Sequence, residues 1–330
     1  MTTIKPVEDI VRKIRESKCL AITSHLRPDG DSLCTGLALV DAFTSLGKVA
    51  DYVITDPIPV PFNSFPECRR IRIGQIPSTG YDAVVLLECA DVSRSGQTGI
   101  DGYYKINIDH HYSNSFYADI NWVDAEAAAV AELALELCEA AGVVLTPRIA
   151  DHLYCAIVSD TGSFQFSNTT ARAFASCTKL VTAGARPIET SEALYHNNRP
   201  EKILLLGRVL STLRLNDTGT IARMGMFRKD LIELNLREVD TEDITTLARS
   251  IKGVKVVLFF KEMEPDVFRV SIRSKGEAHA AAIAEHFGGG GHAHAAGFTV
   301  YGPFATLSVE VMATVERLLA EQAKAPAESR

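Results

Sequence analysis

The chain has 330 residues, of which 46% are hydrophobic, and its formal net charge is −7. This length suits two domains rather than one core, and the hydrophobic content excludes a largely disordered protein. Proteins that follow long nucleic acids present a basic surface to the phosphates, so the negative charge disfavours that class. It is compatible with a small charged substrate bound at a local positive patch.

Nothing in the sequence pattern predicts export or membrane insertion. No apolar stretch reaches the ~18 residues that a membrane span needs, and the first residues lack the apolar core of a signal peptide. The seven cysteines contain no Cys-x-x-Cys pair, and their odd number argues against a disulfide framework. We therefore expect a reduced, cytoplasmic protein that does not enter a membrane.

Residues 1–196 alternate between short apolar runs and segments with helical periodicity, which predicts an α/β domain. We expect a doubly wound, mostly parallel sheet with helices on both faces. The predicted strands are 20–23, 83–87 and 104–108, with a short extended segment at 163–166. The predicted helices are 7–16, 33–46, 126–141, 148–159 and 170–183.

The pattern changes after residue 196. Residues 197–215 are expected to form a linker that contains a helix at 201–213. Residues 216–330 are expected to form a smaller α+β domain, because strand patterns are followed by a long helical pattern. The predicted strands here are 220–226, 254–260 and 267–272, and the last helix is 304–322.

Acidic residues and histidines gather where the predicted elements end. They are His25, Asp29 and Asp31 after strand 20–23, Glu88 after strand 83–87, Asp109-His110-His111 after strand 104–108, and Asp160 at the end of helix 148–159. Taken alone, Asp29 and Asp31 fit a turn residue and a helix N-cap, and the Asp-His-His triplet fits a surface turn.

Taken together, these residues predict a metal site. Open α/β sheets bind ligands outside the carboxyl ends of their strands. Carboxylates that are forced together there need a compensating cation. Oxygen and imidazole ligands suit Mn²⁺, Mg²⁺ or Zn²⁺, and their number is enough for two ions that share one carboxylate.

Four motifs give the chain a resemblance to a known family. His25-x3-Asp29-Gly30-Asp31, Asp109-His110-His111 and Ser159-Asp160-Thr161-Gly162 resemble three of the four signature motifs of the DHH phosphoesterases. The fourth corresponds to Glu88-Cys89-Ala90-Asp91. The segments 271–275 and 287–297 resemble the DHH-associated substrate-binding domain, and the domain sizes resemble those of stand-alone nanoRNases and pAp (3′-phosphoadenosine-5′-phosphate) phosphatases.

The resemblance implies two divalent ions, with Mn²⁺ favoured and Mg²⁺ or Co²⁺ as alternatives. It implies His25, Asp29 and Glu88 as ligands of one ion. The ligands of the other would be Asp31, Glu88, His110 and Asp160. The family usually offers an aspartate where this chain has Glu88, and glutamate is one methylene longer, so it bridges two ions only if its backbone lies further back or its rotamer folds. We favour Glu88 as the bridging ligand because the strand pattern ends there, and Asp91 is the alternative.

The Asp-His-His triplet has two further implied roles. Asp109 would orient His110 or hold the loop, and it is counted with His110 and His111 among the catalytic residues. His111 would contact the substrate phosphate or protonate the leaving oxygen, and both roles stay open.

The glycine run near residue 290 carries the predicted substrate site. A flexible loop after helix 280–287 is the alternative, but His292 and His294 and the apolar run that follows favour a nest of backbone N–H groups for phosphate. The expected substrate-binding residues are Arg273, Ser274, Gly289, Gly290, Gly291 and His292.

The implied substrates are di- to penta-ribonucleotides, cleaved to 5′-mononucleotides, and pAp, converted to AMP. The alternatives are a hydrolase of cyclic di-AMP or its linear product pApA, a RecJ-like single-strand exonuclease, an inorganic pyrophosphatase and a nucleotide-binding sensor with weak catalysis. The relatives also suggest a homodimer.

Overall fold

The computed structural model describes residues 6–196, 198–237 and 241–324. The chain divides into two compact units, Met1–Asn197 and Asn198–Arg330. The first unit contains α1 (Pro6–Glu16), β1 (Cys19–Ser24), α2 (Gly30–Ser45), β2 (Val49–Ile54), η1 (Phe62–Ser64), η2 (Pro66–Arg70), β3 (Arg72–Ile73), β4 (Ala83–Leu87), η3 (Val92–Ser95), β5 (Lys105–Asp109), β6 (Ile120–Val123), α3 (Val130–Ala141), α4 (Pro147–Asp160), α5 (Ala171–Thr182) and α6 (Pro187–Tyr195).

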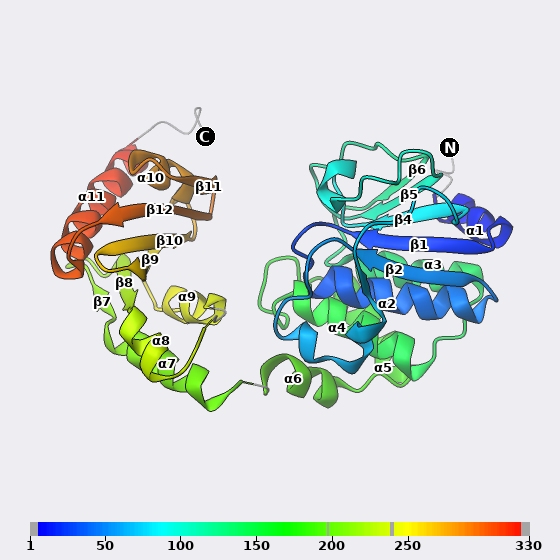
Figure 1. The fold of residues 1–330 in the computed structure, drawn as a ribbon, viewed down its shortest axis with the longest axis horizontal. Coiled ribbons are helices and arrows are strands. Elements are labelled where there is room, and N and C mark those ends of the chain that lie inside the picture. Colours follow the sequence, from blue (N-terminus) through cyan, green and yellow to red (C-terminus); the bar gives the residue numbers. More distant parts are fainter. Residues whose placement is uncertain (1–5, 197, 238–240, 325–330) are drawn as a thin grey trace. The chain divides into compact units, whose positions relative to one another are not determined.

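The first unit is built on a six-stranded sheet with the order β3-β2-β1-β4-β5-β6 (Figure 1). Every neighbouring pair is parallel. All five residues of β4 are buried, as expected for a strand that is covered on both faces. The predicted α/β fold with a mostly parallel sheet is confirmed.

The two faces of this sheet are covered differently. Helices α1, α2 and α3 contact the strands on one face, where Ile22, Val85 and Ile108 belong to the main core. Helices α4 and α5 extend the same core by packing against α2 and α3. On the other face Val84 and Leu86 pack against side chains of the connections between β3 and β5, which include the short helix η3. We predicted helices on both faces, whereas among the described residues the second face is covered by these connections and not by α-helices. The segment over the second face has glycines at positions 74, 80, 96, 99 and 102, and glycine disfavours an α-helix.

The strand order places a ligand-binding position between β1 and β4. From β1 the chain proceeds to β2 and β3 on one side, whereas β4 leads to β5 and β6 on the other. This reversal is the topological switch point at which open parallel sheets bind ligands, outside the carboxyl ends of the strands. His25 follows β1 and Glu88 follows β4, so both lie at this position.

The second unit is an α+β structure around a mixed sheet. It contains α7 (Pro200–Ser211), β7 (Arg214–Leu215), β8 (Ile221–Met226), α8 (Arg228–Glu233), α9 (Glu242–Arg249), β9 (Val256–Glu264), β10 (Val267–Ser274), α10 (Ala280–His286), β11 (Gly290–His292), β12 (Ala295–Tyr301) and α11 (Phe304–Lys324). The sheet order is β11-β12-β10-β9-β8-β7, in which β8 and β9 are parallel and the other pairs are antiparallel.

Both faces of the second sheet contact helices. α10 and α11 share one core with β9, β10 and β12. On the other face Leu205 and Val209 of α7 are fully buried in a core with Met224 and Phe259 of the sheet. The helix expected in the linker is therefore part of the second unit's core. None of the described helices combines the length and hydropathy of a membrane-spanning segment.

Candidate metal centre

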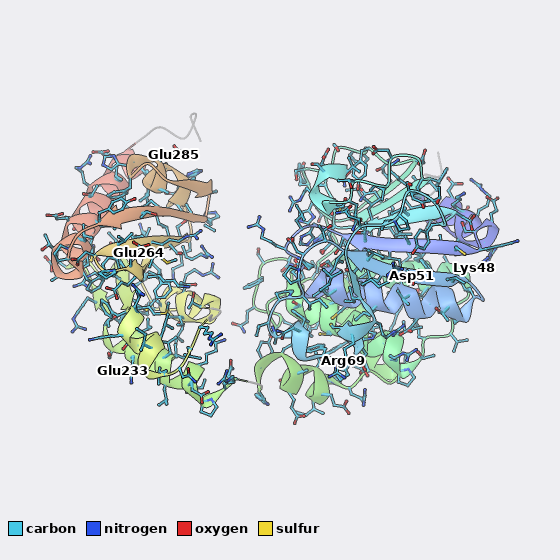
Figure 2. All side chains as sticks on the ribbon, viewed as in Figure 1. Lys48, Asp51, Arg69, Glu233, Glu264 and Glu285 are labelled. Carbon is cyan, nitrogen blue, oxygen red and sulfur yellow. The ribbon has the colours of Figure 1, made fainter. Side chains whose placement is uncertain are left out.

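Most charged side chains lie at the surface of the two units, as Arg69, Glu233 and Glu285 do in Figure 2. Asp31 and Glu88 are exceptions, since each is only 1% exposed. Buried carboxylates are costly unless a positive charge or hydrogen-bond donors compensate them. Their surroundings therefore indicate what the site binds.

Glu88 connects two groups of side chains at the switch point. Its Oε2 lies 3.5 Å from Nε2 of His25, and its Oε1 lies 3.4 Å from Nε2 of His110. His25, Asp29 and Glu88 form one set of converging ligand atoms, which we call the His25 cluster. Asp31, Glu88 and His110 form the second set, the His110 cluster.

Asp160 lies beside the His110 cluster. Its Oδ2 is 3.9 Å from Nε2 of His110. All six residues that the sequence predicted as metal ligands are thus close together, although they come from four separate segments of the chain. Their role as ligands remains a prediction.

The histidine rings are oriented as metal ligands usually are. Nδ1 of His25 lies 2.8 Å from the carbonyl oxygen of Leu26, and Nδ1 of His110 lies 3.1 Å from that of Ala127. A carbonyl oxygen can only accept a hydrogen bond, so each Nδ1 carries the hydrogen. Metal-binding histidines commonly donate this N–H to a carbonyl and coordinate through the other nitrogen. Here Nε2 is the nitrogen that faces the carboxylates.

The carboxylates of the site lie so close together that a positive charge between them would be favourable. Burial raises the pKa of Glu88 well above its ordinary value, and the nearby carboxylates of Asp31 and Asp29 raise it further. Burial, together with Asp31, raises the pKa of Asp160 to about 7. Burial opposes protonation of His25, but the nearby carboxylates of Asp29 and Glu88 outweigh it and raise the histidine pKa to about 10.

One atom of the site is suited to contact a cation. Among the described residues, Oε2 of Glu88 has no hydrogen-bond partner although it is buried. A buried carboxylate oxygen without a donor is expensive, and a bound cation would satisfy it. The mixed oxygen and imidazole donors suit Mn²⁺, Mg²⁺ or Zn²⁺.

The backbone of Glu88 answers the question that its extra methylene raised. Its φ is +55°, a left-handed conformation that non-glycine residues adopt at a cost of about 1–3 kcal/mol. In this conformation both carboxylate oxygens reach the two histidines. Asp91, the alternative ligand, instead caps η3 by accepting a hydrogen bond from the backbone N–H of Ser93 at 2.9 Å.

Backbone atoms at the start of α3 hold the His110 cluster. Oδ2 of Asp31 accepts from the N–H of Val130 at 2.5 Å, and Oδ1 accepts from the N–H of Ala131 at 3.2 Å. The partly positive N-terminus of α3 thus stabilises the Asp31 carboxylate. The Ala127 carbonyl, which fixes the ring of His110, belongs to the same segment. Nothing in this alanine-rich sequence signalled such a role.

The His25 cluster is held by local contacts at the start of α2. Asp29 is the N-cap of α2, with Oδ1 accepting from the N–H of Ser32 at 3.0 Å. Its Oδ2 faces Nε2 of His25 at 3.7 Å, and its side chain is 52% exposed. The sequence offered Asp29 as a turn residue and Asp31 as the N-cap, but the N-cap is Asp29, and the same carboxylate also faces the histidine. Asp31, by contrast, lies inside the helix.

Glycine in the first motif has a structural cause. A Cβ on Gly30 would lie 2.1 Å from Oγ of Ser159 and 2.5 Å from the ring of Phe62. Only glycine permits this close approach of α2 to the end of α4. The contact brings the segment of Asp29 and Asp31 next to Asp160.

Asp109 is fully buried and organises the Asp-His-His loop. Its Oδ1 accepts from the backbone N–H groups of His110 at 2.8 Å and His111 at 3.1 Å, and from Nδ1 of His111 at 2.7 Å. Its Oδ2 accepts from Asn114 at 2.6 Å. Asp109 therefore fixes the His111 ring, whose side chain is 36% exposed.

The glycine run of the second unit leads into the edge strand β11. A Cβ on Gly289 would lie 2.2 Å from the carbonyl oxygen of Gly297, and Gly291 has a φ of +151°. These glycines permit the close pairing of β11 with β12. Glycines 288–290 also line a cavity of about 540 Å³ together with Arg269.

The other predicted substrate-binding residues have different surroundings. Ser274 is buried, and its hydroxyl donates to the carbonyl oxygen of Ala278 at 2.7 Å. Nη1 of Arg273 donates to the carbonyl oxygen of Ile272 at 3.2 Å. The side chain of His292 lies outside the described part of the structure. Arg269, which sequence reasoning missed, shares the face of Arg273 because strand residues four apart point the same way.

Comparisons with known proteins agree with this architecture. Residues 20–157 match the model of the DHH family, N-terminal domain, and residues 230–321 match the DHHA1 domain. A Thermus thermophilus protein named "Bifunctional oligoribonuclease and PAP phosphatase NrnA" is 34% identical over 85% of this chain and 84% of its own length. A Bacillus subtilis protein of the same name is 26% identical over 89% of this chain and 93% of its own.

Solved structures show the same fold. A Bacteroides fragilis exopolyphosphatase-related protein superimposes with a TM-score of 0.85 at 20% identity, covering 98% of this chain and all of its own. RecJ from Thermus thermophilus in complex with Mn²⁺ gives a TM-score of 0.52 at 14% identity, covering 98% of this chain and 55% of RecJ. The resemblance seen in the motifs is thereby confirmed: the chain belongs to the DHH family of phosphoesterases.

Proposed function

We propose that this protein is a metal-dependent phosphoesterase that cleaves very short oligoribonucleotides to 5′-mononucleotides and removes phosphate from pAp. The observation that carries the proposal is the position of Glu88, whose two oxygens each face one histidine. The relatives named as bifunctional oligoribonucleases and PAP phosphatases match over most of their own lengths, which supports the substrate class.

The residues present suit two divalent ions. His25, Asp29 and Glu88 would hold one of them, and the His110 cluster with Asp160 would hold the other. When bound, such ions lower the pKa of water and stabilise the charge on phosphoryl oxygens. We favour Mn²⁺ because hard oxygen ligands are combined here with imidazole.

His111 is suited to deliver a proton to the leaving oxygen. Asp109 accepts from Nδ1 of His111 and thereby leaves Nε2 as the atom that exchanges a proton with the substrate. Asp109 acts through His111 and through the backbone of the loop, since it is fully buried.

The second unit would bind the phosphates of the substrate. Arg269 and Arg273 lie on one face of β10, and the cavity beside Arg269 is lined by backbone of glycines 288–290. Within the described part of the chain, Arg269 has no carboxylate partner and is exposed. Guanidinium groups and glycine N–H groups are suitable donors to phosphate oxygens.

The proposal is tested with purified protein and a panel of substrates. We expect Mn²⁺-dependent release of mononucleotides from di- to penta-ribonucleotides and of phosphate from pAp. Cyclic di-AMP and long single-stranded DNA complete the panel, because they represent alternative activities, and linear di-AMP is compared with other diribonucleotides. Faster turnover of cyclic di-AMP or long DNA than of short RNA and pAp would contradict the proposal, as would turnover confined to linear di-AMP or binding of pAp without hydrolysis.

A variant tests the phosphate-binding role of the second unit. Arg273→Ala should raise KM for short RNA about tenfold while kcat changes little, because a charge-assisted hydrogen bond contributes about 1.5–3 kcal/mol. Arg317→Ala, at an exposed arginine of α11, is the control. Unchanged kinetics in Arg273→Ala would remove this residue from the substrate site.

The expected cytoplasmic location and homodimer also stay predictions, and light scattering of the purified protein checks the dimer.

A further inference from the structure

Asn168 lies in the connection between α4 and α5 and contacts the His110 cluster from outside. Its Nδ2 lies 3.0 Å from the carbonyl oxygen of Ala128 and 3.1 Å from the carbonyl oxygen of Asp160. The same nitrogen lies 3.4 Å from Oδ2 of the Asp160 carboxylate. One side-chain amide thus connects the carboxylate to two backbone carbonyls.

The two carbonyls belong to the framework that holds the other members of the cluster. Ala128 lies between Ala127, whose carbonyl fixes the His110 ring, and Val130, whose N–H binds Asp31. Asp160 has no comparable backbone contact among those described for its carboxylate. Asn168 therefore ties Asp160 to the segment 127–131, which already positions the other two ligands.

A helix-capping role does not explain Asn168. The sequence Ser-Asn-Thr-Thr before α5 suggests that any of these residues could cap the helix. The N-cap is Thr170, whose Oγ1 accepts from the N–H of Ala173 at 3.2 Å.

The oxygen of the Asn168 amide is in an unfavourable environment. Its Oδ1 is buried, and no hydrogen-bond partner for it exists among the described residues. An unsatisfied buried acceptor destabilises a protein by about 1–3 kcal/mol. The hydrogen bonds that Nδ2 of Asn168 donates offset this unfavourable burial of Oδ1, and they explain why an asparagine lies here.

We infer that Asn168 is a positioning residue that holds the Asp160 carboxylate in place for the cation of the His110 cluster. The inference rests on the proposed function, because it presupposes that this cluster binds a divalent ion. By donating to Oδ2, the amide restricts rotation of the carboxylate and places it 3.9 Å from Nε2 of His110. Residues that orient metal ligands in this way affect affinity strongly although they do not contact the ion.

The test is Mn²⁺ binding to the full chain, measured by isothermal titration calorimetry and by electron paramagnetic resonance of the free ion. Asn168→Leu keeps the side-chain volume and removes the donor. We expect one Mn²⁺ to bind about 10- to 100-fold more weakly, while the second ion keeps its affinity. The kcat measured at low Mn²⁺ should fall, KM for the nucleotide should stay, and saturating Mn²⁺ should restore kcat.

Asn121→Leu is the matched control. The Asn121 amide also bonds to backbone, since it donates to the carbonyl oxygen of Ala118 at 2.7 Å and accepts from the Ala118 N–H at 3.1 Å. It has no contact with either cluster among those described, so Mn²⁺ affinity should stay at the wild-type value.

Each outcome decides the matter. Wild-type affinity for both ions in Asn168→Leu and in Asn168→Ala would overturn the inference. Loss of folding in both variants would also overturn it, because the residue would then be structural. If the wild-type protein binds no Mn²⁺, the proposed function fails, and that result is separate from any difference between the variants.

Discussion

The His25 cluster and the His110 cluster share Glu88 but are built in different ways. Asp29 of the His25 cluster caps the helix that follows it, and half of its side chain is exposed. Asp31 of the His110 cluster is buried, and backbone groups almost a hundred residues away hold it. A ligand that the fold fixes in advance loses little entropy when a cation binds. The His110 cluster is therefore the better organised of the two.

The largest effect is expected from the residue that the clusters share. Glu88→Gln should lower kcat about 10³-fold or more, because metal ions contribute several kcal/mol and each 1.36 kcal/mol is tenfold in rate. Mn²⁺ titration should show both ions weakened. The metal-free variant should unfold at the same or a higher temperature, since a buried carboxylate is removed. Weakening of a single ion would show that Glu88 does not bridge the clusters.

Separate carboxylate variants compare the two clusters directly. Asp31→Asn should lower kcat about 10²- to 10³-fold, as does loss of one preorganised group in other active sites, and Asp29→Asn should lower it less. Asparagine caps helices as well as aspartate, so Asp29→Asn leaves α2 intact. Steady-state kinetics at several Mn²⁺ concentrations measure both. A larger loss in Asp29→Asn would reverse the ranking of the clusters.

The stability of the metal-free protein should depend on pH, because the carboxylates of the two clusters change the pKa of the neighbouring histidines. Burial lowers the pKa of both His25 and His110, but the nearby carboxylates outweigh it and raise this pKa from 6.5 to about 10. A raised histidine pKa stabilises the fold fully below 6.5, and this contribution is lost as the pH rises through about 10. The unfolding temperature of the metal-free protein should therefore fall between pH 6.5 and 10.

Mn²⁺ should remove this dependence, because the cation replaces the protons. His25→Asn and His110→Asn should each flatten the curve of the metal-free protein. Differential scanning fluorimetry in the presence of EDTA measures it. A curve that stays flat in the wild-type protein would contradict the charge balance described for the clusters.

The smallest effect on Mn²⁺ affinity is expected at Tyr52, which contacts the segments that carry His25 and Asp29. Its hydroxyl lies 2.9 Å from Oγ of Ser24 and 2.9 Å from the carbonyl oxygen of Ser32. Tyr52→Phe should cost about 1 kcal/mol of unfolding free energy, the net value of one hydrogen bond. Mn²⁺ affinity should fall only a few-fold.

Tyr103→Phe is the control in urea denaturation. Its hydroxyl donates to the carbonyl oxygen of Pro77 at 2.7 Å, on the loop-covered face of the sheet. It should lose similar stability without any change in Mn²⁺ affinity. Equal Mn²⁺ affinity in both variants would show that Tyr52 has no role in the site.

Several elements were predictable because their signals are local. The apolar run 83–87 is β4 without any shift, and the helical period at 33–46 corresponds to α2. The segment 163–166 was predicted as extended, and this was wrong. Gly162, Ser163 and Phe164 all have positive φ, and the chain turns there. Side-chain periodicity carries no information on such backbone conformations.

By itself the sequence determined the α/β class, the parallel sheet and the family, because apolar periodicity and motif spacing depend on residues near one another in the chain. It also named the side chains that converge at the switch point. Only the tertiary structure decided that Glu88 rather than Asp91 faces both histidines, and that the backbone of residues 127–131 holds Asp31 and His110. The physical reason is that backbone N–H and C=O groups are the same in every residue, so only folding shows which of them a distant side chain meets.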